Sequence, residues 1–146
     1  MSASKFIVKF FDEKYENLSF EELCKAPVSA ISGISESDAT DLKKAFGIDT
    51  VEELATNKYV LLSQGINCFS KSSGQILDKT FESAEFEELR KKPVSAVSGV
   101  SESDSVLLKK TFGIDTIQEL AENKYVMIAQ FVTALASLAK ILGVTL

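Results

Sequence analysis

The chain has 146 residues, of which 45% are hydrophobic and 25% are charged. This composition is typical of a folded globular protein and excludes a disordered chain. The formal net charge of -5 argues against binding nucleic acid by bulk electrostatics, because proteins that do so are usually basic. The chain contains no histidine, so it lacks the commonest general base and the commonest metal ligand.

The first element is expected at residues 4–15, where the spacing of apolar residues fits both a strand and a helix. Val8 and Phe10 alternate as in a strand, whereas Phe10 and Phe11 also fit one helical face. A related segment later in the chain, residues 76–81, has a helical pattern. We therefore predict a helix at residues 4–15.

A short helix and a glycine hairpin come next. Ser19 and Glu22 have the spacing of a capping box, which predicts the start of a helical turn. Pro27 begins a second short helix that is expected to reach about Ser32. Gly33 can adopt the left-handed conformation that ends this helix.

The helix after the hairpin has strong end signals. Ser35 is the expected N-cap, and Asp38 completes a capping box while favouring the positive end of the helix dipole. Gly47 is the expected end of the helix. The residues predicted to face inward recur at helical spacing and are Ala39, Leu42 and Phe46.

Two further helices are expected after this one. Thr50 and Glu53 form another capping-box pattern, and Asn57 is placed to restart the chain into a last helix. Residues 65–74 then contain a cluster of serine and glycine. We predict that this cluster is a linker.

The segment that begins at Phe20 occurs twice in the chain. Roughly 30 of the 42 positions from Phe20 to Leu61 are identical in the segment that begins at Phe86. The hairpin and capping residues of the second copy are Gly99, Ser101 and Asp104. We therefore predict an all-α fold of two tandem helical units, residues 1–70 and 71–146, that pack about a pseudo-two-fold axis.

The second copy ends in a long apolar helix, expected at residues 125–142. Its polar residues recur every three or four positions and are Gln130, Thr133, Ser137 and Lys140. A helix that is apolar on most sides with one thin polar line is typical of a bundle core or of a dimer seam. Membrane contact and a membrane span are the weaker alternatives.

Neither cysteine has a counterpart in the other copy. Cys24 corresponds to Arg90 and Cys68 to Ala134, and no C-x-x-C spacing is present. We predict two reduced thiols, with Cys68 buried. The beginning of the chain has no pattern of a secretory signal, so we expect a cytoplasmic protein.

The order of helix, glycine hairpin and second helix resembles the helix-hairpin-helix superfamily. The usual hairpin of that family reads Leu-x-Gly-Ile-Gly and is followed by a helix and by Gly-Ile-x-Thr. Ile31-Ser32-Gly33-Ile34 and Gly47-Ile48-Asp49-Thr50 occupy these positions, and Ser35 and Ser101 replace the second hairpin glycine of each copy. The resemblance covers roughly half the chain or more.

The resemblance implies sequence-independent DNA binding, in which hairpin N–H groups hold a phosphate and nearby lysines supply charge. In this chain acidic residues, including Asp38 and Asp104, flank the positions where a phosphate would lie. A carboxylate there would fill the anion site and repel a phosphate by about 1 to 4 kcal/mol. The lysines that could contact a nucleic acid are Lys43, Lys44, Lys109 and Lys110.

We therefore expect a non-catalytic protein-interaction or scaffold module, with sequence-independent nucleic-acid binding as the alternative. No nucleophile–base pair or phosphate-binding glycine loop is evident, which predicts that the chain is not an enzyme and binds no cofactor or metal. The partner is expected to be a protein. A homodimer through the C-terminal helix is one form that this interaction could take.

Overall fold

The computed structural model describes residues 8–76 and 84–145, and this part of the chain is all-α, as predicted. Strand-like pairing within it is limited to isolated bridges, such as those of Pro27 with Thr50 and of Pro93 with Thr116. The α-helices are α1 (Phe20–Lys25), α2 (Glu36–Phe46), α3 (Val51–Thr56), α4 (Lys58–Ile76), α5 (Ala84–Leu89), α6 (Glu102–Phe112), α7 (Ile117–Ala121) and α8 (Lys124–Leu142). The short 3-10 helices are η1 (Val8–Phe10), η2 (Glu13–Tyr15), η3 (Val28–Ala30) and η5 (Val94–Ala96).

Five α-helices begin at the capping boxes that the sequence predicts. In each capping box a side-chain oxygen accepts from a backbone N–H three residues on, and the acidic side chain accepts from the N-cap N–H. The five N-cap residues are Ser19, Ser35, Thr50, Ser101 and Thr116. Gly47 and Gly113 end α2 and α6 in the left-handed conformation, with φ of 71° and 69°. Local sequence therefore determines these helix boundaries.

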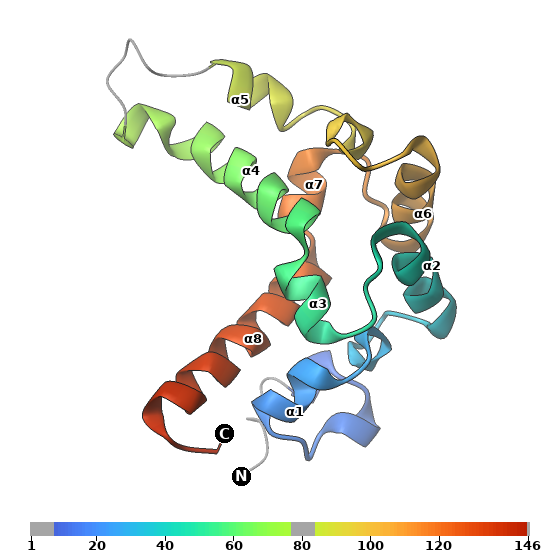
Figure 1. Cartoon of the computed structure of the whole chain (residues 1–146), viewed down its shortest axis with the longest axis vertical. Coiled ribbons are helices and arrows are strands. Elements are labelled where there is room, and N and C mark those ends of the chain that lie inside the picture. Colours follow the sequence, from blue (N-terminus) through green and yellow to red (C-terminus); the bar gives the residue numbers. More distant parts are fainter. Residues whose placement is uncertain (1–7, 77–83, 146) are drawn as a thin grey trace.

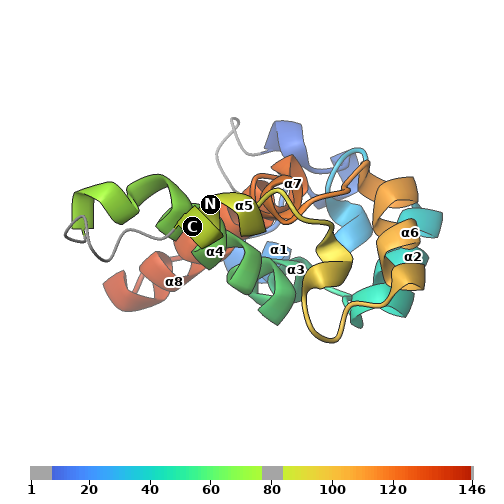
Figure 2. The ribbon, with the colours of Figure 1, turned by 90° about the horizontal axis from the view of Figure 1, so that it is seen from above.

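Each long helix packs against short helices from the other copy of the repeated sequence. α8 contacts α1 and α3, whereas α4 contacts α5 and α7. The two helices that follow the hairpins, α2 and α6, lie side by side (Figures 1 and 2). The chain is therefore held together largely by contacts between the copies rather than within them.

One apolar cluster runs through both copies. Twelve of its least exposed members occupy matching positions of the repeated sequence, which is the burial pattern expected if each helix turns one apolar stripe inward. In the first copy they are Val28, Leu42, Ile48, Val51, Leu54 and Val60, and in the second copy Val94, Leu108, Ile114, Ile117, Leu120 and Val126. Ala39 and Phe46, which were also predicted to face inward, are half-buried and pack against this cluster.

The helix predicted at residues 4–15 is wrong for its described part. Residues 8–15 form two separate 3-10 turns, and residues 4–7 lie outside the described residues. Between the turns, Asp12 N donates to Ala30 O and Ser32 N donates to Phe10 O, both at 2.8 Å. These bonds form a small pairing with the chain after η3 and bury Phe11. Tertiary pairing has therefore replaced a local helix.

The linker predicted at residues 65–74 is also wrong, because α4 continues through this segment to Ile76. The division of the chain at residues 70 and 71 stays a prediction, but that position lies inside α4. Cys68 was expected to be buried and is exposed, whereas Cys24 is buried. The short helix expected from Pro27 to Ser32 is the 3-10 helix η3, which follows Pro27 directly.

Candidate functional site

The two hairpins have their helix N-termini occupied by the chain's own side chains. Ser35 N donates to Asp38 Oδ2 at 3.0 Å, and Asp38 N donates to Ser35 Oγ at 3.0 Å. Ser101 and Asp104 make the same pair of bonds at 3.1 and 3.0 Å. A carboxylate therefore holds each position that a phosphate would need.

The four candidate lysines lie at the other end of the same helices. Lys43 and Lys44 are in the last turn of α2, as Lys109 and Lys110 are in α6. An 11-residue helix spans about 16 Å, so neither pair of lysines is brought to its own hairpin. Asp49 pairs with Lys43 and raises the pKa of that ammonium group.

The second copy repeats this charge pairing. Asp115 pairs with Lys109 at 2.5 Å and raises its pKa. Lys110 pairs with Asp41 of α2 at 3.4 Å, while Lys44 is exposed. Three of the four candidate lysines therefore already have a carboxylate partner within the chain.

A tyrosine of each copy covers the hairpin glycine of the other. Gly33 has φ of 99°, and a Cβ placed there would lie 2.6 Å from Tyr125 Oη. Gly99 has φ of 96°, and a Cβ placed there would lie 2.5 Å from Tyr59 Oη. Both glycines are therefore required for two reasons, the backbone conformation and the close approach of a ring.

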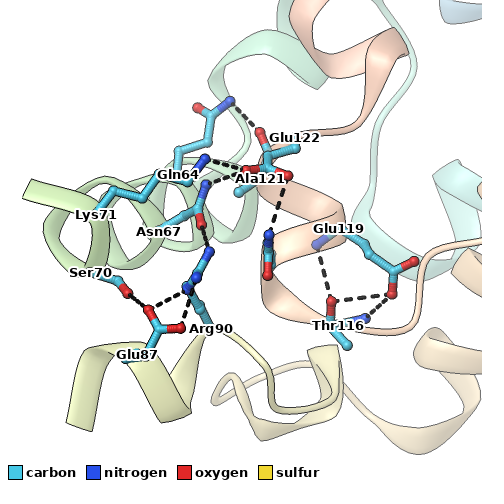
Figure 3. A network of polar contacts seen from close by, with 11 residues as sticks. Gln64, Asn67, Ser70, Lys71, Glu87, Arg90, Thr116, Glu119, Ala121 and Glu122 are labelled. Atoms are coloured by element: carbon cyan, nitrogen blue, oxygen red, sulfur yellow. Dashed lines mark hydrogen bonds and ion pairs between the residues drawn. The ribbon is translucent and has the colours of Figure 1, made fainter. Parts of the chain in front are cut away.

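A cluster of polar side chains joins α4, α5 and α7 in one half of the molecule (Figure 3). The guanidinium of Arg90 donates to both carboxylate oxygens of Glu87 at 2.8 Å, and Ser70 Oγ donates to the same carboxylate at 2.7 Å. These contacts, with Arg90 first among them, lower the pKa of Glu87 to about 2. Lys71 and Asn67 hold Glu122 in the same way and lower its pKa.

The other half of the molecule has a cavity near the buried thiol of Cys24. Its volume is about 310 Å³, and it lies between α1, α3 and the second half of α8. Its walls include Glu21, Cys24, Glu52, Thr133 and Lys140. Burial raises the pKa of the Cys24 thiol, which keeps it protonated and a poor nucleophile.

A second hollow lies over the hairpin and the helix α6 of the second copy. It has a volume of about 530 Å³ and is lined by residues that include Pro93, Glu102, Val106, Lys109 and Asp115. Lys109 and Asp115 are bound to each other at its edge. We find no group of side chains here that converges on one point.

The long helix α8 carries a row of exposed apolar side chains. Met127, Phe131, Leu138 and Ile141 are 53%, 50%, 45% and 80% exposed, and their spacing of three, four or seven residues places them on one side of the helix. Of the polar line, Gln130 and Thr133 are half-buried and face the chain. The expectation of a mostly buried helix is therefore only partly met, because α8 buries Val126, Ala129 and Val132 but leaves the apolar row exposed.

Among the described residues, the stretch Ile117–Leu142 contains an 18-residue window, with a mean hydropathy of 1.7, that is long and apolar enough to cross a membrane by length and composition alone. This is weak evidence, because a core helix of a soluble protein passes the same test. The stretch is also interrupted, since α7 ends at Ala121 and Asn123 caps the start of α8.

The chain matches no protein-family model, and no curated protein or solved structure gives a match. Within the described residues, no group of three or more histidine, cysteine, aspartate or glutamate side chains is placed to hold a metal ion. The sequence analysis missed the cavity and the polar cluster of Figure 3. Both could have been predicted from one difference between two otherwise similar copies, which have Cys24 and Arg90 at the same position.

Proposed function

We propose that this chain is a non-catalytic protein-interaction module, located in the cytoplasm and built from two helix-hairpin-helix-like units. The units are related by a pseudo-two-fold axis, and the long helix of each completes the core of the other. The axis is supported by contacts that occur twice, the second time between the two counterpart residues, each 66 positions away in the sequence. Tyr59 with Gly99 and Tyr125 with Gly33 are one such pair of contacts.

The observation that carries the proposed function is the exposed apolar row of α8, defined by Met127, Phe131, Leu138 and Ile141. Single exposed apolar residues are ordinary, but a contiguous set marks an interaction surface. The row follows the spacing by which an apolar helix face pairs with another helix. Covering it would remove apolar area from water, which is the main favourable term in most protein association.

The equivalent helix of the first copy has a shorter exposed apolar segment. Leu61 and Leu62 are about half exposed, but the next turn has Gly65 where α8 has Phe131. The change from Gly65 to Phe131 therefore lengthens the apolar surface on α8 alone. We infer that docking is a property of the second unit.

Comparative affinity capture from the native cell tests this proposal. The bait is the full chain, compared with Phe131→Glu/Leu138→Glu and with the control Val106→Glu, which places a charge at an exposed apolar position on α6. A protein, including a second copy of this chain, should be recovered with the wild type and with Val106→Glu and lost with the double variant. Equal recovery with all three baits would contradict the proposal.

A further inference from the structure

We propose that the cavity beside Cys24 binds the guanidinium group of an arginine side chain from a partner protein. The inference rests on the proposed function only in taking the ligand to be part of a protein. The site itself is separate, because no residue of the exposed apolar row lines the cavity. The observation behind it is that the other half of the molecule holds an arginine of its own at the matching position.

That arginine is Arg90, the counterpart of Cys24 at an offset of 66 residues. Its side chain is only 16% exposed. Arg90 Nε and Nη2 each donate to Glu87 at 2.8 Å, and Nη1 donates to Asn67 Oδ1 at 3.4 Å. Glu87 and Asn67 thus form a carboxylate and amide site for a planar cation.

The residues at the matching positions of the first half also contact each other beside the cavity, but the cysteine there supplies no guanidinium group. Cys24 Sγ donates to Thr133 Oγ1 at 3.7 Å, where the other half has the contact of Arg90 with Asn67. Glu21, the counterpart of Glu87, lines the cavity. Where the second half has the long Arg90 and the acceptor Asn67, the first half has the short Cys24 and the hydroxyl of Thr133. The carboxylate of Glu21 is retained, and it borders a space of about 310 Å³.

Glu21 has the capacity to hold a second cation. It pairs with Lys25 at 3.1 Å, and Glu87 pairs with the matching Lys91 at the same 3.1 Å while also binding Arg90. One carboxylate thus holds a lysine and an arginine together in the other half. Among the described residues, Glu21 holds only the lysine.

The charges of the cavity wall differ in one further respect from those around Arg90 in the second copy. Glu52 lines the cavity, whereas the matching residue of the second copy is Gln118. Lys25 and Lys140 also line it, so the walls carry two carboxylates and two ammonium groups. A guanidinium can form two parallel bonds to one carboxylate, which a lysine cannot do, and this geometry favours arginine as the ligand.

The size of the cavity suits one side chain. Sites for small molecules range from about 300 to 1,000 Å³, and this cavity lies at the lower end of that range. The buried thiol of Cys24 and the apolar side chains of Ala136 and Ala139 lie beside the polar groups. They provide a surface for the methylene groups of an arginine side chain.

Titration of the isotope-labelled full chain with the blocked arginine acetyl-arginine-amide, followed by NMR, tests the inference. Saturable shifts are expected at the amides of residues 21, 24, 52, 133 and 140. Acetyl-lysine-amide should bind at least tenfold more weakly. Glu21→Gln should weaken arginine binding about tenfold by removing a charge-assisted pair, whereas Glu88→Gln, which makes the same charge change at an exposed site on α5, should leave it unchanged.

Cys24→Arg supplies the missing side chain and gives a second test. It should abolish binding of the blocked arginine and raise the melting temperature, because the new guanidinium can pair with Glu21. Shifts of equal size from the arginine and lysine probes, or unchanged binding in Glu21→Gln, would overturn the inference. Phe131→Glu/Leu138→Glu should bind the probe normally, so failure of this site and failure of the docking proposal are separate results.

Discussion

Gln64 and Gln130 exchange a pair of hydrogen bonds between α4 and α8. Each Nε2 donates to the Oε1 of the other side chain, at 2.7 and 2.6 Å. Each also donates to a backbone carbonyl, Gln64 to Ala121 and Gln130 to Ala55. All four partners are related by the same offset of 66 residues, so this pair is where the proposed pseudo-two-fold axis would pass.

The glutamine pair should be energetically coupled. Gln64→Ala removes the donor to Gln130 Oε1 and to the carbonyl of Ala121 in a half-buried site, at a cost of about 1–3 kcal/mol, while Gln130 Nε2 keeps its bond to Ala55 O. Gln130→Ala should cost a similar amount, and the double variant should cost less than the sum. Urea unfolding of the four proteins measures the coupling. A control cycle of Gln130→Ala with Gln118→Ala should be additive within about 0.5 kcal/mol, and additivity at the glutamine pair itself would contradict the contact.

Glycine substitutions should have opposite effects at the hairpins and in α4. Gly33→Ala introduces both an unfavourable backbone conformation and a methyl group 2.6 Å from Tyr125 Oη, and should destabilise the chain by about 1–3 kcal/mol. Gly65→Ala lies within α4 with open space around it, and should stabilise by about 0.5–1 kcal/mol. Thermal unfolding distinguishes the two. Equal effects of the two substitutions would contradict both the left-handed conformation of Gly33 and the close approach of Tyr125.

The ion pair of Glu87 with Arg90 should contribute to acid stability over a defined range. Hydrogen bonds from Arg90, and after it from Ser70 and Lys91, lower the pKa of Glu87 from 4.5 to about 2. A carboxyl group with a depressed folded-state pKa stabilises the fold fully above its unfolded pKa, and this stability is lost as the pH falls through the folded pKa. The contribution of Glu87 should therefore disappear as the pH falls from about 4.5 to about 2.

Unfolding free energies of the wild type and Glu87→Gln, measured across this range, provide the check. The variant should be less stable at neutral pH, and the difference should shrink as the pH falls. A difference that stays constant from neutral pH to about pH 2 would mean that the ion pair does not lower the pKa of Glu87.

Duplex DNA should bind weakly or not at all, with a shallow salt dependence. The hairpin N-termini hold Asp38 and Asp104, and Lys43 and Lys109 are paired with aspartates. Anisotropy titrations at low and moderate salt measure the affinity. Tight binding with a steep salt slope, lost when Lys43, Lys44, Lys109 and Lys110 are changed to Glu, would instead establish the nucleic-acid alternative.

The elements with local signals could be predicted from the sequence. The capping boxes at Ser35 and Thr50 and the left-handed Gly47 depend on residues within a few positions of each other. Their helix boundaries follow from those residues alone. The segment around Phe11 has no such signal, and its structure depends on bonds to Ala30 and Ser32 about 20 residues away.

The two proposed binding surfaces depend on contacts between the copies and could not be predicted from either copy alone. The side of α8 that faces the chain is determined by the hydrogen bonds of Gln130 with Gln64 and of Thr133 with Cys24. Helical periodicity identified the polar line of α8 but not the direction in which it points. The linker prediction failed for a related reason, because the packing of α4 against α5 and α7 favours a helix where serine and glycine favour a loop.

Photo-crosslinking in the native cell is the most direct test of the docking surface. Benzoylphenylalanine replaces Phe131, an exposed aromatic residue of the α8 row, and in a second protein it replaces Val106 on α6. The proposed function predicts crosslinked protein adducts of defined mass from position 131 and none from position 106. Absence of adducts at position 131, or the same adducts from both positions, would contradict it.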